Sequence, residues 1–189
     1  MINFEKFLPK LKSNDNFVIE ETIDEIGIIQ AAEPVGEVRE LLLQYCKHKD
    51  PYIRRVALRA TAMHWSFPEA FEILAYMLTG GESDDEVLDV ACSSIGCYAG
   101  NKKITDNKIN ELYILALENN NLSEEYRKQI YLDFLKYHNL IDMKGYISAN
   151  INNSVSFFID MNLVYEKIKE GRNCSKRITR KFSKIRIIG

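Results

Sequence analysis

Long apolar runs are absent from this sequence of 189 residues. No stretch of about 18 apolar residues occurs, so we expect no membrane-spanning helix. Residues 1–20 do not follow the order of a secretory signal, because Glu5, Lys6 and Lys10 interrupt any apolar segment. Proline (4) and glycine (9) are too scarce for a collagen-like or linker-like chain, and 46% hydrophobic residues exclude a disordered one. We therefore expect a folded cytoplasmic protein.

Sequence signatures of catalysis and of metal binding are also missing. The chain contains no G-x-S-x-G, no G-x-x-x-x-G-K-[ST], no G-x-G-x-x-G and no H-E-x-x-H motif. Its cysteines form no C-x-x-C pair, which favours reduced thiols in the core over a disulfide framework or a tetrahedral metal site. These cysteines are Cys46, Cys92, Cys97 and Cys174. We therefore predict no enzyme activity, no catalytic residue, no cofactor and no metal.

The net charge of −2 conceals a division along the chain. Residues 167–189 contain nine basic residues against one acidic residue, a net charge of +8 that leaves −10 for residues 1–166. An acidic body repels nucleic acid and favours a basic protein partner, whereas the basic tail has the opposite preference. Three roles remain open for the tail: covering the last helices, contacting nucleic acid, or lying on an anionic membrane.

A weak pattern recurs along the sequence at intervals of 29 to 39 residues. Each copy begins with a polar residue suited to capping a helix, with an apolar residue three positions later and a small or apolar residue four positions after that. The clearest copies begin at Asp50 and Asp84, a bulkier one begins at Ser123, and looser ones begin at Asp15 and Asn152. This spacing places the marked side chains on one face of a helix.

Segments with the apolar spacing of a further helix lie between these copies, at 36–48, 68–79 and 105–118. Pro68 suits the first position of its helix, and Gly80 with Gly81 suits the end of the same helix. Each unit is therefore expected to be a helix, a short turn and a second, capped helix. No strand-like alternation of useful length occurs before residue 184, and residues 184–188 fit only a short edge strand.

Residues 49–64 resemble the HEAT repeat, and the resemblance extends over about residues 33–140. The second helix of that family typically opens with Asp, followed by an aliphatic residue, Arg and two alanines. The residues that match here are Asp50, Ile53, Arg54, Ala57 and Ala60. In the next two units the matching residues are Asp84, Val87, Ala91, Gly96, Ser123, Tyr126 and Arg127. Leu88 departs from the pattern, because it stands where the family has Arg.

The resemblance implies an all-α fold, specifically a right-handed α-solenoid of about five stacked helical hairpins, since one hairpin cannot bury its apolar face alone. We expect this architecture over residues 1–166, with residues 167–189 as a basic C-terminal segment that caps the repeats or contacts a partner. Members of this family are usually scaffolds that bind other macromolecules. The resemblance also implies that Arg54 and Arg127 form bonds within or between repeats.

Three functions are compatible with these observations. The first is a non-enzymatic protein-binding scaffold or adaptor, one version being an immunity-type inhibitor of a basic partner. The second is a nucleic-acid-binding protein related to HEAT-like alkylpurine DNA glycosylases, which the resemblance permits and the acidic body opposes. We expect nucleic acid to bind only through the tail. The third is a repeat-type lyase or chaperone for a prosthetic group, which no residue selects.

Candidate contact residues lie outside the apolar register of the second helices and in the basic tail. The acidic residues near Asp84 have two explanations that remain open, capping with a solvated face or a docking surface for a basic partner. His64 and Trp65 are interpreted as structural residues at a helix end. The predicted partner-binding residues are Arg55, Arg59, Asp85, Glu86, Asp89, Lys176, Arg177 and Arg180.

Overall fold

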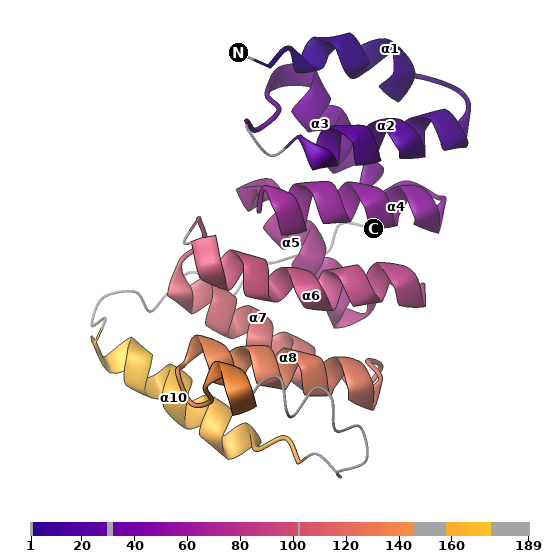
Figure 1. Ribbon diagram of the computed structural model, residues 1–189. Helices are drawn as coiled ribbons and strands as arrows, with labels where there is room; N and C mark the ends of the chain where they lie inside the picture. Colours follow the sequence, from indigo (N-terminus) through magenta and orange to yellow (C-terminus); the bar gives the residue numbers. More distant parts are fainter. Residues whose placement is uncertain (1, 30–31, 102, 146–157, 175–189) are drawn as a thin grey trace, which may run out of the picture. The chain divides into compact units, whose positions relative to one another are not determined.

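The computed structural model describes residues 2–29, 32–101, 103–145 and 158–174, and every regular element in these ranges is helical (Figure 1). The prediction of an all-α protein is therefore confirmed. The α-helices of the body are α1 (Leu8–Leu11), α2 (Asn16–Ile28), α3 (Gly36–Tyr45), α4 (Pro51–Leu58), α5 (Pro68–Tyr76), α6 (Asp85–Asn101), α7 (Asp106–Glu118) and α8 (Glu124–Tyr137). A 3₁₀ segment, η1 (Phe4–Phe7), precedes them, and π-helical segments η2 (Arg59–His64) and η3 (Met77–Gly81) continue α4 and α5.

Four of the predicted capping residues do cap helices. The side chain of Asp15 accepts a 3.0 Å hydrogen bond from the backbone N–H of Phe17, and that of Asp50 accepts one of 3.0 Å from the backbone N–H of Tyr52. Asp84 accepts two such bonds, both at 3.1 Å, at the start of α6. Ser123 accepts one at 3.2 Å at the start of α8. Each bond satisfies a donor that the first helical turn would leave unpaired. Asn152 lies outside the described residues.

These capped helices contact one another in chain order. Helix α2 packs against α4, α4 against α6, and α6 against α8, and the four lie side by side in Figure 1. The intervening helices α3 and α7 pack against α4 and α8, the second helices that follow them. Contacts therefore join elements that are close in sequence.

Small residues allow this close approach. Ala57 on α4 and Ala91 on α6 are fully buried. The Ile53 and Val87 side chains on the same helices are at most 1% exposed. The looser copy on α2 differs, because its predicted core position, Val18, is only half-buried and the neighbouring Ile19 is buried instead.

The predicted helix ends are also found. Gly80 adopts a φ of 107°, a conformation that a residue with a Cβ rarely adopts, and the helical chain ends at Gly81. Asn119 ends α7, and its side-chain amide donates a 2.7 Å hydrogen bond to the carbonyl of Leu78.

Residues 160–189 form a separate compact unit, and residues 1–159 form the body. The described part of the second unit is α10 (Met161–Cys174). The predicted domain boundary between residues 166 and 167 falls within this helix. Lys176, Arg177 and Arg180, and the strand considered for 184–188, lie outside the described residues.

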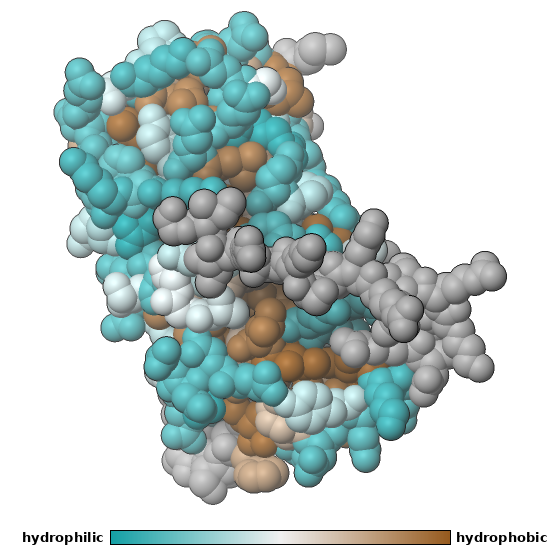
Figure 2. All heavy atoms as spheres, turned by 180° about the vertical axis from the view of Figure 1, so that it is seen from behind, coloured by the Kyte–Doolittle hydropathy of each residue, from teal (hydrophilic) through white to brown (hydrophobic). Residues whose placement is uncertain are grey.

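Hydrophilic residues cover most of the described surface seen in Figure 2, and apolar residues appear in patches between them. Within the described ranges, no helix combines the length and the apolar character that a bilayer crossing requires.

Tyr98 offers a test of the packing between α5 and α6. Its hydroxyl is fully buried and donates a 2.7 Å hydrogen bond to the carbonyl of Phe67, and its ring lies edge-on to Phe71. We expect Tyr98→Phe to lower the free energy of unfolding by about 1–2 kcal/mol, because the Phe67 carbonyl loses its partner in the core. Urea denaturation followed by circular dichroism measures this. Tyr76→Phe, at a tyrosine that is 60% exposed, is the matched control and should leave the midpoint unchanged.

Candidate functional site

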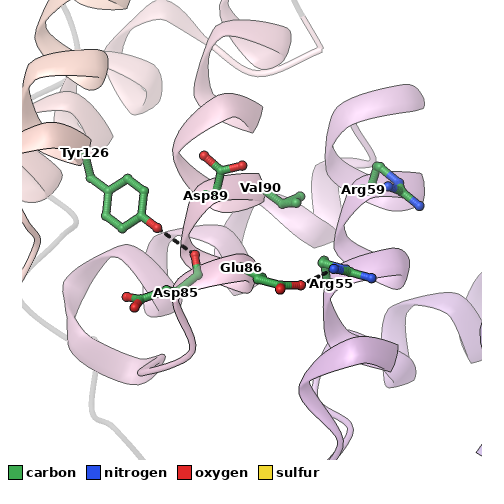
Figure 3. Close-up of a pocket in the computed structure, with 7 residues that line it drawn as sticks. All are labelled: Arg55, Arg59, Asp85, Glu86, Asp89, Val90 and Tyr126. Atoms are coloured by element: carbon green, nitrogen blue, oxygen red, sulfur yellow. Dashed lines mark hydrogen bonds and ion pairs between the residues drawn. The ribbon is translucent and has the colours of Figure 1, made fainter. Parts of the chain in front are cut away.

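A pocket of about 490 Å³ opens along the capped helices α4, α6 and α8 (Figure 3). Its lining residues come from α4 with η2, from α6, and from α8. They are Arg55, Arg59, Asp85, Glu86, Asp89, Val90 and Tyr126. We call this feature the α4–α6–α8 groove.

The groove brings together five of the predicted contact residues: Arg55, Arg59, Asp85, Glu86 and Asp89. The positions of Arg55, Glu86 and Asp89 follow from the repeat, since residues two and five positions after the capping residue project away from the buried face of each helix. That these residues bind a partner stays a prediction. The three predicted residues of the tail lie outside the described residues, so no arrangement is assigned to them.

Sequence reasoning missed two lining residues, Val90 and Tyr126. Tyr126 occupies the apolar position of its repeat, where Ile53 and Val87 are buried, so the repeat pattern alone predicts that it lies on the buried helix face. In the structure it is partly exposed, and its hydroxyl donates a 2.7 Å hydrogen bond to the backbone carbonyl of Asp85. The available signal was the hydroxyl itself, because a buried tyrosine requires a hydrogen-bond partner that isoleucine and valine do not.

Ion pairs occupy the side of the groove nearest α4. Arg55 bonds the carboxylate of Glu86 and lies 3.7 Å from that of Glu20 on α2, and Figure 3 shows the Arg55–Glu86 pair closing this side. Arg59 pairs with Asp24 of α2 at 2.5 Å. Both arginines are therefore neutralised within the protein.

The side of the groove between α6 and α8 has a different character. Asp85 and Asp89 form no ion pair with any described residue, although both are exposed carboxylates. Burial raises the pKa of Tyr126, and the nearby charges of Asp85 and Asp89 raise it further. Two carboxylates therefore lie near the ring of Tyr126, the aromatic wall of the groove.

A hydrogen-bonded clamp between Arg54 and Glu82 lies next to the groove. Arg54 Nε and Nη2 donate to the two carboxylate oxygens of Glu82 at 2.7 and 2.8 Å, and Nη1 donates to the carbonyls of His48 and Lys49 at 2.8 and 3.0 Å. Glu82 also accepts from the backbone N–H groups of Ser83 and Asp84, at 2.9 and 3.0 Å. The clamp therefore joins the turn before α4 to the turn before α6.

The structure thus places Arg54 where the repeat pattern predicts a bonding arginine. Its equivalent on α8, Arg127, makes one long contact of 3.4 Å to the Asn120 side chain, and its buried Nε has no partner among the described residues. Leu88, at the same position of α6, is 8% exposed and belongs to the core. Only the first of these three positions carries a bidentate clamp.

The residues that the sequence predicts to be structural are buried, or have pKa values that burial shifts toward the uncharged form. Trp65 is 5% exposed and stacks on Phe67 with ring centroids 5.5 Å apart. Burial and the charge of Arg59 lower the pKa of His64, against a smaller opposite effect of Asp24. Burial raises the pKa of Cys46, and likewise that of Cys92, to about 12, so both remain thiols. In the described ranges no group of three or more His, Cys, Asp or Glu is arranged to hold a metal ion.

Comparison of the chain with protein-family models, with curated proteins and with solved structures finds no match in any of the three. The resemblance to HEAT repeats therefore stays a prediction from the sequence pattern.

The clamp predicts a measurable coupling between Arg54 and Glu82. The Arg54 side chain is 17% exposed and that of Glu82 is 5% exposed, so removing one partner leaves a poorly solvated charge behind. We expect Arg54→Ala to cost about 1–3 kcal/mol of unfolding free energy. In a double-mutant cycle with Glu82→Ala, the two losses should be less than additive by about 0.5–3 kcal/mol. Fully additive losses would show that the pair contributes nothing as a pair.

The same clamp predicts a dependence of stability on pH. Burial tends to raise the pKa of Glu82, but the hydrogen bonds from Arg54 and from the backbone N–H groups of Asp84 and Ser83 outweigh burial and lower the pKa below its usual 4.5. A lowered folded-state pKa gives stability that is complete above the unfolded value and is lost as the pH falls through the folded value. The stability difference between the native protein and Glu82→Gln should therefore be constant near neutral pH and shrink below about pH 4.5. Chemical denaturation at pH 3.5 and pH 7 measures this, and an unchanged difference contradicts it.

Proposed function

We propose that this chain is a non-enzymatic protein-binding module built from HEAT-like repeats. The proposed architecture is a right-handed α-solenoid of about five helical hairpins, in which each hairpin buries its apolar face against its neighbours. Three features support it: capping residues at corresponding positions of α2, α4, α6 and α8, contacts between these helices in chain order, and small buried residues where they meet.

The observation that carries the proposal is the α4–α6–α8 groove. Three successive capped helices contribute to it, so a ligand that fills it contacts side chains from three repeats at once. Extended surfaces of this kind in repeat proteins suit macromolecular partners. The groove includes the ring of Tyr126 and two arginines, residue types that are enriched at protein-binding surfaces.

Charge selects the class of partner. The groove contains three carboxylates and two arginines, and both arginines already pair with carboxylates of the protein. Residues 1–166 carry a net charge of −10, which opposes the approach of nucleic acid phosphates and favours a basic protein surface. An adaptor or an immunity-type inhibitor that covers a basic protein is consistent with this charge.

Photo-crosslinking from within the groove tests the proposed function. A photoreactive phenylalanine analogue replaces Tyr126, and a second protein carries the analogue at the exposed Tyr76 of α5, outside the groove. Both are expressed at full length in cells of the source organism, irradiated, and analysed by mass spectrometry. We expect one protein to be crosslinked from position 126 and to be absent from the position 76 sample. A product from position 126 that nuclease digests, or equal products from both positions, contradicts the proposal.

A further inference from the structure

Charged residues at one repeat position alternate in sign along the capped helices. Each is the fifth residue after its capping residue, and the series runs Glu20, Arg55, Asp89 and Lys128 on α2, α4, α6 and α8. Residues at corresponding positions of neighbouring stacked helices face the same side, so such a series can form a ladder of ion pairs across the surface. Arg55 follows this rule on its α2 side, where it lies 3.7 Å from Glu20.

The ladder is interrupted at α6. On that side Arg55 bonds Glu86 and not Asp89, and Arg59 is engaged by Asp24 of α2. Asp89 therefore lacks a cationic partner among the described residues, as does Asp85 one helical turn before it. The interruption coincides with the α6–α8 side of the groove.

Residues four apart on a helix lie on the same face, so Asp85 and Asp89 present two carboxylates to the same space. Figure 3 shows both on the side of α6 nearest Tyr126. The Tyr126 hydroxyl is held by the backbone of Asp85 rather than by its carboxylate, so the ring is fixed and the carboxylate keeps its acceptors free. Val90, which is 9% exposed, adds apolar lining on which the methylene chain of a long side chain could pack.

We propose that an arginine side chain of the protein partner enters the groove between α6 and α8 and supplies the cation that Asp85 and Asp89 lack among the described residues. The planar guanidinium can donate to the carboxylates of Asp85 and Asp89 while it stacks on the ring of Tyr126, a combination that a lysine ammonium matches less well. This inference rests on the proposed function, because it names the group by which the partner is held.

Phosphate groups do not fit this place. Two unpaired carboxylates would face the phosphate, and the nearest cations of the groove, Arg55 and Arg59, are already paired. The chemistry of the α6–α8 side therefore favours a basic peptide segment over a nucleic acid strand.

A titration followed by NMR tests the inference with defined probes. The full-length ¹⁵N-labelled protein is titrated with N-acetyl-arginine methylamide, with the lysine compound, and with the uncharged citrulline compound of nearly the same shape. We expect the arginine compound to bind with millimolar affinity and to shift the amide resonances of Asp85, Asp89, Val90 and Tyr126. The lysine compound should bind at least threefold more weakly, and citrulline should produce no saturable shift.

Matched variants locate the binding. The double variant D85N/D89N keeps the side-chain shapes and removes two charges, and it should weaken the arginine compound at least tenfold. The control E124Q/E125Q removes the same charge from the first turn of α8 at residues that do not line the groove, and binding should stay within twofold. Circular dichroism verifies that both variants are folded.

Three results would overturn the inference: equal shifts with citrulline, equal weakening in the control variant, or shifts centred on the acidic residues of α2. None of these results bears on whether position 126 crosslinks to a protein. A specific crosslink together with a failed titration would therefore reject the arginine anchor alone, whereas loss of the crosslink would reject the proposed function.

Discussion

The clamp between Arg54 and Glu82 is the interaction on which the arrangement of the groove depends. It connects the turn that precedes α4 with the turn that precedes α6, and through the bonds that Glu82 accepts from Ser83 and Asp84 it holds the residue that caps α6. The first turn of α6 carries Asp85 and Glu86 into the groove. The largely buried Arg54–Glu82 pair thus sets the positions of the Asp85 and Glu86 carboxylates relative to Arg55. A pair of this kind contributes mainly through the cost of leaving either partner alone.

Local features of the fold could be predicted from the sequence, because their causes are local. The caps at Asp15, Asp50 and Asp84 depend on one side chain and the next few N–H groups, and the helix end at Gly80 depends on a single backbone conformation. The charged groove residues Arg55, Glu86 and Asp89 follow from the same periodicity, since residues outside the apolar register must project elsewhere.

Features that involve distant segments could not be derived in the same way. The repeat pattern predicts a bonding role for Arg54, but its partner Glu82 lies 28 residues away and no local signal in the sequence pairs the two. Tyr126 stands at a repeat position that is buried in α4 and α6, so the pattern alone does not predict its place in the groove. Both outcomes depend on how adjacent helices are stacked, and Arg127 shows that a matching residue type does not guarantee a matching contact. The alternation of charge at the fifth repeat position can be read from the sequence, but which of these residues pair depends on the same stacking.

The π-helical segment η2 has a consequence for how the chain tolerates a change of length. Its wider turn is recorded in the bond from the Trp65 N–H to the Ala60 carbonyl at 3.3 Å, which spans one residue more than an α-helical bond. The segment therefore holds a spare residue between Arg59 and His64. Loss of one residue there could be absorbed by tightening to an ordinary α-turn, leaving the frame of α4 and its groove-facing arginine undisturbed. Helix α6 contains no π-helical turn, so an insertion or deletion inside it would turn every later residue of the helix by about 100° relative to the helices packed against it.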